Sequence, residues 1–363
     1  MFGTATLFSS LPRAVAAGQG RPGGGEDSLG AAAARSGALF GAAIDLTALE
    51  NTAYASLYAR EAGLLATENA FKIAALRRGP EPADIDFTSV DLLLDFAEQH
   101  KLPLRAHTLI WNDDLPGWLT ALSGREVERL FDAHIEAVVS RYAGRIFAYD
   151  VVNEPLFPWR GASPDGYRRG AWFDALGPSY IGRAFRRVAA LDRKAKLVLN
   201  EAFTERDDAI GRVMRPRLLR LIDDLLAAGT PLGAVGLQGH IQPQYGFAAD
   251  AYGELLHEIG RRGLEIHVTE LDVDDTQLPS EIAARDAGVA QLYARFAATA
   301  LSEPAVKAIV TWGLSDRYSW YREPKMMRNL PAGRLPRPLP FDDRLARKPA
   351  YEALKTAFAA RRA

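Results

Sequence analysis

The chain has 363 residues, of which 48% are hydrophobic and 25% charged, a composition typical of globular proteins. Its formal net charge of -1 gives no overall field that would attract nucleic acid or an anionic membrane surface. The absence of cysteine excludes a disulfide scaffold, a thiolate metal site and a cysteine nucleophile. No apolar run is long enough to predict a membrane-spanning helix.

The first 27 residues differ from the rest of the chain. Residues 1–10 are mostly small or apolar, and Ala14-Val15-Ala16 fits a signal-peptide cleavage site, although no positively charged stretch precedes it. Residues 18–25 are glycine-rich and predict a flexible linker. We therefore expect residues 1–27 to be the remnant of an export signal followed by a linker, and the protein to be secreted or periplasmic. A leader without a targeting role is the alternative.

Residues 28–363 alternate between short apolar segments and helical patterns. Each apolar segment is bounded by polar residues, glycine or proline, which predicts strands at 39–43, 63–67, 102–109, 147–152, 196–199, 234–237, 265–268 and 308–311. Apolar residues at helical spacing predict helices at 90–99, 126–142, 180–191, 217–228, 283–300 and 351–359. Eight strands alternating with helices predict a single-domain (β/α)8 TIM barrel. An open doubly wound sheet is the alternative, but no glycine-rich phosphate turn follows an early strand.

Polar side chains recur where the predicted strands end. In a barrel these ends meet at one face, which is where catalytic residues lie. Taken singly, each has an ordinary explanation, such as a helix cap for Asn200 or a core position for Trp312. Together they predict one polar site. They are Glu68, Asn69, Lys72, His107, Trp111, Asn153, Glu154, Asn200, Glu201, Gln238, His240, Glu270, Asp272, Trp312, Asp316 and Trp320.

Glu154 and Glu270 end two of these strands, and a pair of carboxylates is what hydrolysis of a glycosidic bond requires. One protonates the leaving oxygen, while the other attacks the sugar or activates water. Amides, lysine and imidazole can bind sugar hydroxyls, and indole rings can stack on sugar faces. A carboxyl separation of ~5–5.5 Å would retain the anomeric configuration and one of ~6.5–9.5 Å would invert it. The sequence alone leaves these two outcomes open.

Other catalytic classes receive less support from the sequence. His107, His240, His267, Glu154 and Glu270 could form a divalent-metal site, but neither an H-x-H after the first strand nor an H-E-x-x-H is present. Strict alternation along its strand would also turn His267 away from the side of Glu270. A serine nucleophile is not indicated, because no G-x-S-x-G turn occurs. We therefore expect neither a metal nor a cofactor.

Several motifs, in their order along the chain, resemble those of glycoside hydrolase family 10, the endo-β-1,4-xylanases. The resemblance extends from about Ser28 to Ala359, nearly all of the chain after the leader. The motifs are Leu39-Phe40-Gly41; Thr67-Glu68-Asn69 with Lys72; His107-Thr108-Leu109-Ile110-Trp111; Asp150-Val151-Val152-Asn153-Glu154; Leu176-Gly177 with Tyr180-Ile181; Gly236-Leu237-Gln238-Gly239-His240; Thr269-Glu270-Leu271-Asp272-Val273; Trp312-Gly313-Leu314-Ser315-Asp316 with Ser319-Trp320; and Lys348-Pro349-Ala350-Tyr351.

The resemblance implies a metal-independent, retaining endo-β-1,4-xylanase that acts as a monomer on xylan or xylo-oligosaccharides. It implies that Glu154 is the general acid/base, Glu270 the nucleophile, and Asn153 the amide that binds the 2-hydroxyl of the cleaved sugar. Asp272 resembles a carboxylate that orients its neighbours. Residues that resemble those holding the sugars on the non-reducing side, or supporting the two glutamates, are Glu68, Asn69, Lys72, His107, Trp111, Gln238, His240, Trp312 and Trp320.

Two other functions remain open at this point. One is a β-glycosidase that prefers short xylo-oligosaccharides or other β-1,4 glycans. The other is a barrel that binds glycans without cleaving them, in which one of the two glutamates would be expected to be replaced. Both glutamates are present.

The chain departs from the family pattern near the expected cut site. Tyr149 and Asn112 stand where tryptophan and histidine are common, and Ala202-Phe203 stands where an aromatic residue and asparagine are usual. A proline- and arginine-rich loop between Trp320 and Pro349 is too proline-rich to predict a helix and should lie beside the active face. It could be a substrate wall or a surface excursion. Arginines that could meet acidic side groups of xylan, or else be solvated, are Arg322, Arg328, Arg334 and Arg337.

Overall fold

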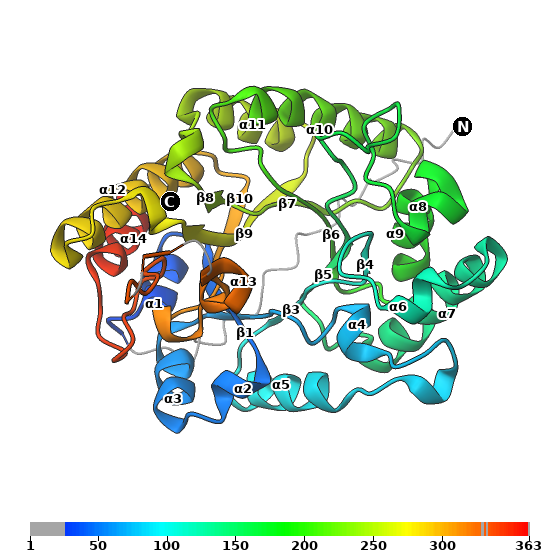
Figure 1. Cartoon of the computed structure of the whole chain (residues 1–363), viewed down its shortest axis with the longest axis horizontal. Coiled ribbons are helices and arrows are strands. Elements are labelled where there is room, and N and C mark those ends of the chain that lie inside the picture. Colours follow the sequence, from blue (N-terminus) through cyan, green and yellow to red (C-terminus); the bar gives the residue numbers. More distant parts are fainter. Residues whose placement is uncertain (1–25, 328–329, 332, 362–363) are drawn as a thin grey trace, which may run out of the picture.

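A computed structural model describes residues 26–327, 330, 331 and 333–361. The predicted leader lies almost wholly outside these residues. Eight parallel strands form a closed barrel surrounded by helices, seen end-on in Figure 1. The barrel strands are β1 (Leu39–Ile44), β2 (Leu64–Thr67), β3 (Leu104–Ala106), β5 (Ala148–Asn153), β6 (Lys196–Glu201), β7 (Ala234–Leu237), β9 (Glu265–Val273) and β10 (Val306–Thr311).

The barrel closes because β10 pairs in parallel with both β1 and β9. This confirms the predicted (β/α)8 barrel, and each of the eight predicted strands is present. Two short strands that were not predicted, β4 (Ile110–Trp111) and β8 (His240–Ile241), pair with the C-terminal parts of β5 and β9. They lengthen the barrel at the end where the polar residues were expected.

Long helices form the outer layer of the barrel. They are α1 (Leu29–Arg35), α3 (Thr52–Glu61), α5 (Thr88–Gln99), α7 (Gly124–Tyr142), α9 (Tyr180–Leu191), α10 (Ala209–Ala227), α11 (Ala249–Arg261), α12 (Ile282–Leu301) and α14 (Pro349–Ala360). Shorter helices lie in the connections, namely α2 (Leu46–Leu49), α4 (Ile73–Leu76), α6 (Gly117–Thr120), α8 (Ala171–Leu176) and α13 (Pro324–Met327). All six predicted helices are present, whereas α1, α3 and α11 were not predicted. Helix α10 begins at Ala209, before its predicted start at residue 217, and contains Pro216.

Local capping explains where several helices begin. The Asp208 side chain accepts the backbone N–H groups of Ile210 and Gly211 at the start of α10. Ser123 and Glu126 form a reciprocal capping box at the start of α7. Such a cap satisfies backbone donors that the helix itself leaves unpaired, and typically contributes ~1 kcal/mol. The helix positions, and hence the lengths of the loops at the barrel ends, therefore follow from the sequence locally.

The barrel interior changes character along its axis. Near the N-terminal ends of the strands it is filled by small apolar clusters, one containing Leu64 and Ala308 and another containing Ala148 and Val198. Above these clusters the interior holds charged and polar side chains. Arg105 is almost fully buried, pairs with Asp150, and has its Nη1 2.9 Å from Nδ1 of His267. A buried arginine is tolerated here because each buried charge has a partner.

Two irregularities in strand pairing decide which side chains face the interior. The register of β5 against β6 shifts between Asp150 and Val152, and that of β9 against β10 shifts between Val268 and Leu271. A bulge of this kind breaks the strict alternation of side chains. The prediction that His267 faces away from the Glu270 side is therefore wrong. His267 also points into the barrel, one layer below the polar face.

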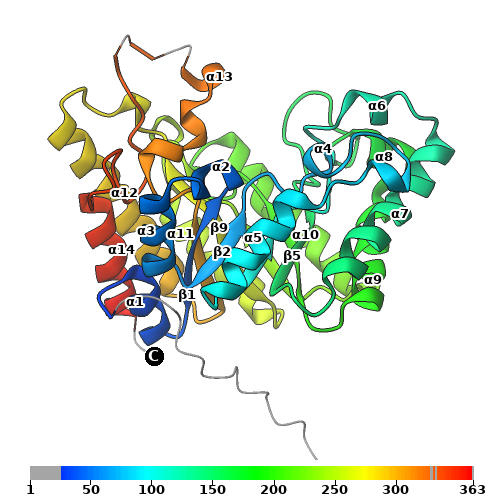
Figure 2. The ribbon, with the colours of Figure 1, turned by 90° about the horizontal axis from the view of Figure 1, so that it is seen from below.

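The proline- and arginine-rich loop lies at the C-terminal face of the barrel, as predicted. Figure 2 shows α13, which belongs to this loop, and α6 on opposite sides of that face. The prediction that the loop is too proline-rich to be helical is wrong for this one turn. Pro324 occupies the first position of α13, where a missing N–H costs nothing.

The arginines of this loop anchor it to the barrel. Arg337 forms a two-point ion pair with Asp286, at 2.7 and 2.6 Å. Arg334 donates to the main-chain oxygens of the β9–α12 connection, and Arg322 pairs with Asp343. Neither interpretation of these arginines, as a site for acidic sugars or as solvated surface, describes these three contacts. Arg328 lies outside the described residues.

Within the part of the chain that the structure describes, no helix combines the length and apolarity needed to cross a bilayer.

Candidate active site

A cleft of about 540 Å³ opens at the C-terminal ends of the barrel strands. Most of the side chains predicted from strand ends line it. They are Glu68, Lys72, His107, Trp111, Asn153, Glu154, Gln238, His240, Glu270, Trp312 and Trp320. Asn69 and Asp272 stand behind this lining, with Asn69 facing a smaller neighbouring cavity and Asp272 fully buried.

Glu154 follows the last residue of β5 in a left-handed backbone conformation, with φ of 48°. Its N–H donates to the carbonyl oxygen of Asn200 at 2.8 Å, which holds this unusual turn in place. Its carboxylate accepts three side-chain hydrogen bonds. Trp111 Nε1 and Arg168 Nη2 reach Oε2 at 3.2 and 2.7 Å, and Gln238 Nε2 reaches Oε1 at 2.7 Å.

Glu270 lies deeper in the cleft, with 6% of its side chain exposed. His240 Nε2 lies 3.1 Å from Oε2, and Asn200 Nδ2 donates to Oε1 at 2.8 Å. His107 Nδ1 is 3.8 Å from the same Oε1. Burial opposes ionisation of Glu270, but His107, His240 and Asn200 together lower its pKa to about 2. Glu270 is therefore an anion at any ordinary pH.

His240 carries the charge that complements Glu270. Its Nδ1 lies 2.8 Å from Asp272 Oδ1, and Trp320 Nε1 donates to the other oxygen of Asp272 at 2.8 Å. Burial alone would lower the pKa of His240, but Asp272 and Glu270 raise it well above its ordinary value. His240 is thus an imidazolium that donates to a carboxylate from each ring nitrogen.

Asn200, at the end of β6, links the two sides of the site. Its Nδ2 donates to Asn153 Oδ1 and to Glu270 Oε1, both at 2.8 Å, while Thr269 Oγ1 donates to its Oδ1 at 2.7 Å. Gly236 lies directly beneath, since a Cβ at that position would approach Asn200 Oδ1 to 2.2 Å. A glycine is therefore required for this amide to reach both partners.

One side of the cleft combines polar and aromatic side chains. Lys72 Nζ donates to Asn69 Oδ1 at 2.7 Å and lies 5.3 Å from the centre of the Trp111 ring. Trp312 presents an edge-on contact to His107, with ring centres 5.2 Å apart. Burial, together with the nearby Asp45, raises the pKa of Glu68 to about 8, so Glu68 can donate as well as accept a hydrogen bond near neutral pH.

The opposite side of the cleft contains an aromatic group that the sequence did not indicate as functional. Phe157, Trp159 and Phe203 line the cleft and contact one another edge-on, with ring centres 5.1 and 4.8 Å apart. Trp159 is 40% exposed. Phe203 belongs to the Ala202-Phe203 departure from the family pattern. This departure therefore places a phenylalanine in the cleft where the family pattern has an asparagine.

The other two departures lie behind the cleft. The side chain of Asn112 accepts the N–H of Trp172 at 3.0 Å and so holds the start of α8. Tyr149 is fully buried in the layer between strands and helices. Neither residue lines the cleft.

Arg168 and the buried Arg105 were not predicted as parts of the site. A single charged residue in the apolar 102–109 strand was a visible signal for Arg105. Arg168 lies in a long loop 14 residues after Glu154, and nothing in its local sequence indicates where the side chain points. Both arginines reach the site through contacts between segments distant in sequence.

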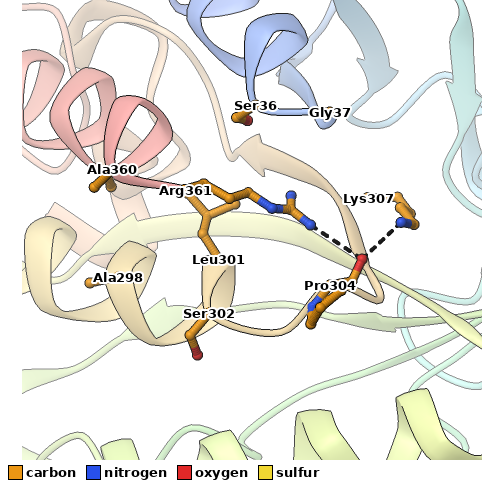
Figure 3. A pocket seen from close by; sticks show the side chains of 10 residues that line it. Ser36, Gly37, Ala298, Leu301, Ser302, Pro304, Lys307, Ala360 and Arg361 are labelled. Carbon is orange, nitrogen blue, oxygen red and sulfur yellow. Dashed lines mark hydrogen bonds between the residues drawn. The ribbon is translucent and has the colours of Figure 1, made fainter. Parts of the chain in front are cut away.

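Among the described residues, including those of the cleft, no group of three or more His, Cys, Asp or Glu could hold a metal ion. A second cavity, of about 620 Å³, lies at the opposite end of the barrel. Figure 3 shows Lys307 and Arg361 there, both donating to the carbonyl oxygen of Pro304. It is far from the glutamates, because it lies where β10 begins.

A closed parallel barrel with two glutamates in one sugar-sized cleft, surrounded by indoles, amides and imidazoles, defines a barrel-type glycoside hydrolase. Comparison with known families agrees with this class. Glycosyl hydrolase family 10 matches residues 28–357, and the chain belongs to that family.

Individual relatives give the same result. Endo-1,4-beta-xylanase A of Caldicellulosiruptor sp. (strain Rt8B.4) is 33% identical over 301 residues, covering 78% of this chain and 42% of that protein. The chain therefore spans less than half the length of that relative. Endo-1,4-beta-xylanase B of Thermotoga neapolitana is 29% identical over 304 residues, covering 83% of this chain and 82% of that protein.

Solved structures resemble the whole barrel. Native xylanase 10B from Thermotoga maritima is 30% identical, with a TM-score of 0.80, covering 91% of this chain and 98% of that one. Xylanase 10B from Thermotoga petrophila RKU-1, solved in complex with xylobiose, also has a TM-score of 0.80 at 30% identity, covering 91% and 97%.

Proposed function

We propose that this protein is an endo-β-1,4-xylanase that retains the anomeric configuration, with Glu154 as general acid/base and Glu270 as nucleophile. The observation that supports this most directly is the environment of Glu270. It is a nearly buried carboxylate that His240 and Asn200 hold in one orientation, at a pKa of about 2. Relatives named as xylanases supply the substrate class.

In the first step, Glu270 attacks the anomeric carbon while Glu154 donates a proton to the departing glycosidic oxygen. A glycosyl ester of Glu270 results. In the second step, Glu154 removes a proton from water, the water oxygen bonds to the anomeric carbon, and Glu270 leaves as a carboxylate. The low pKa of Glu270 assists this second step, since a weakly basic carboxylate is a good leaving group.

Substrate orientation follows from the amide network. Because Asn200 donates to Asn153 Oδ1, the Nδ2 group of Asn153 remains available as a donor inside the cleft. We assign this donor to the 2-hydroxyl of the sugar that is cleaved. Glu68, Lys72, Trp312 and Trp320 would hold the sugars on the non-reducing side, and Asn69 would support Lys72 through its hydrogen bond.

Proton NMR of the first products from a β-1,4-xylan tests the proposal. The β-anomer should appear first, before mutarotation. Early α-anomer would mean that water lies between the carboxylates, and the assignment of Glu270 as a nucleophile would then be wrong. Product lengths from the polymer distinguish internal cleavage from the trimming of short xylo-oligosaccharides.

Two variants test the assigned roles separately. Glu270→Ala should abolish xylan hydrolysis. Glu154→Ala should also lose xylan hydrolysis, yet azide should restore turnover of an aryl β-xylobioside whose leaving group needs no proton, and should yield a β-glycosyl azide. Azide rescue of neither variant, or of Glu270→Ala with the β product, would contradict the assignment.

A further inference from the structure

The aromatic group formed by Phe157, Trp159 and Phe203 lies on the side of the cleft where a leaving group would sit. Phe157 and Trp159 follow β5 and Phe203 follows β6, and these two strands lie across the closed barrel from β10 and β1 (Figure 1). Trp312, which the proposed function assigns to the sugars on the non-reducing side, follows β10. Glu154, which would protonate the leaving oxygen, comes three residues before Phe157 and lines the same cleft. The aromatic group therefore adjoins the cleaved bond on its leaving-group side.

The three rings are held in a fixed arrangement. Trp159 contacts both Phe157 and Phe203 edge-on. The guanidinium of Arg168 lies 4.8 Å from the centre of the Phe157 ring, and that of the nearly buried Arg206 lies 5.7 Å from the centre of the Phe203 ring. A guanidinium over an aromatic face stabilises the ring in that position. Because 40% of Trp159 remains exposed, the group presents apolar surface to the cleft.

Phe203 has a backbone conformation that phenylalanine seldom adopts. Its φ is 64°, in the left-handed region, where asparagine is tolerated far better than an aromatic residue. The family pattern has an asparagine at this position, so the backbone suits that residue better than the one present. A strained residue that persists in a cleft indicates a role for its side chain. The chain thus keeps a ring at this position despite the backbone strain.

The side chains here suit an aromatic ligand better than a sugar. A sugar ring carries hydroxyl groups on its edge, and these need hydrogen-bonding partners when water is displaced. Phe203 offers no such partner, unlike the amide of an asparagine. Arg168 borders the group, but its Nε, Nη1 and Nη2 already donate to Glu154 and Asp113. A benzene ring needs no hydrogen bond and is stabilised by edge-on or offset contact with other rings.

We propose that Phe157, Trp159 and Phe203 bind the ring of an aromatic alcohol, and that the protein transfers xylo-oligosaccharide groups to such alcohols as well as to water. This inference rests on the proposed function. The alcohol takes the place of water in the second step. Its oxygen bonds to the anomeric carbon, Glu154 takes its proton, and the bond from that carbon to Glu270 breaks, which releases the carboxylate. The product is a β-glycoside of the alcohol, and no oxidant or reductant is needed.

A partition experiment on the full chain tests this proposal. β-Xylobiosyl fluoride forms the glycosyl ester of Glu270 and releases only fluoride, so the leaving-group side is empty for an added alcohol. We compare 2-phenylethanol with 1-propanol at equal concentration, because both are primary alcohols and only the first carries an aromatic ring. Chromatography gives, for each alcohol, the ratio of its β-xylobioside to free xylobiose. The selectivity is the quotient of these two ratios. It does not depend on how fast the ester forms, because all products come from the same ester.

The unmodified protein should favour 2-phenylethanol over 1-propanol by about tenfold, since contact with aromatic side chains strengthens binding by roughly that factor. Phe203→Asn, which introduces the asparagine of the family pattern, and Trp159→Ala should each lower the selectivity by about 3–10-fold. Phe203→Tyr keeps a ring and should keep most of the selectivity. Leu92→Ala is the control, because Leu92 is 46% exposed on α5 and does not line the cleft. It should leave the selectivity unchanged.

The inference is overturned if the unmodified protein favours 2-phenylethanol by less than about twofold, or if neither Phe203→Asn nor Trp159→Ala lowers the selectivity. It is also overturned if methyl β-xyloside is a better acceptor than 2-phenylethanol, because the aromatic group would then be a sugar platform. If Phe203→Asn does not fold, as judged by circular dichroism, Trp159→Ala and Trp159→Phe decide by the same quotient. Failure of the proposed function would look different. The unmodified protein would then release α-anomer first from xylan, or would leave both xylan and β-xylobiosyl fluoride intact.

Discussion

Replacing His240 with glutamine should make the nucleophile sensitive to acid. The imidazolium lies 3.1 Å from Glu270, so removing its charge removes up to about 5 kcal/mol of direct attraction at an effective dielectric constant of about 20. Water and His107 compensate for part of this loss. An opposite charge at this range typically shifts a carboxyl pKa by about 1–3 units, which corresponds to about 1.4–4 kcal/mol. The pKa of Glu270 should therefore rise from about 2 to roughly 3–5.

The sign of the effect follows from the role of the ionised form. Because only the carboxylate attacks, activity is lost as pH falls through the pKa of Glu270. The unmodified enzyme should keep its kcat/KM on an aryl β-xylobioside down to pH 4. His240→Gln should already lose activity there, by about tenfold if the shift reaches its upper end. His257→Gln, a change at a 66% exposed histidine on α11, is the control. If the acid limb of the kcat/KM profile against pH does not move in His240→Gln, this account of Glu270 is refuted.

Two further changes should separate activity from stability. Gly236→Ala should cut kcat by at least tenfold with little change in far-UV circular dichroism, because its methyl group would displace the Asn200 amide, 2.2 Å away. Gly124→Ala, where no atom lies within 4 Å of the added Cβ, should leave kcat unchanged. Lys348→Met should lower the free energy of unfolding by about 3–5 kcal/mol in urea titrations, because it leaves the buried carboxylate of Asp316 unpaired. If Lys348→Met lowers the free energy of unfolding no more than the same substitution at an exposed lysine does, this expectation is contradicted.

The strands and the polar residues at their ends were predictable because both depend on short stretches of sequence. A buried parallel strand is a brief apolar run, and its last residues must turn polar where the chain meets the cleft. For this reason Glu154, Gln238 and Glu270 could be placed at one face before any coordinates were considered. The helix α11 was missed although Tyr252, Leu255 and Ile259 have helical spacing, so that omission was not forced by the sequence.

Other features depend on contacts between distant segments, and local patterns do not encode them. The bulge in β9 arises from its pairing with β10, and it reverses the expected direction of His267. The sequence did not indicate the ion-pair partners of the arginines in the loop after β10, because those partners, such as Asp286, lie on another element. Arg168 is the most consequential example, since its position beside Glu154 depends on how a long loop folds back.

The described ends of the chain meet at the end of the barrel opposite the cleft. Asp27 forms ion pairs with Arg347 and Lys355, and Arg361 reaches the carbonyl of Pro304, where β10 begins. A tether joined at either end, such as an affinity tag or a link to a solid support, would therefore leave the barrel on its far side. Immobilised in this way, the protein would present its cleft outward, and a long insoluble polymer could approach it without meeting the support.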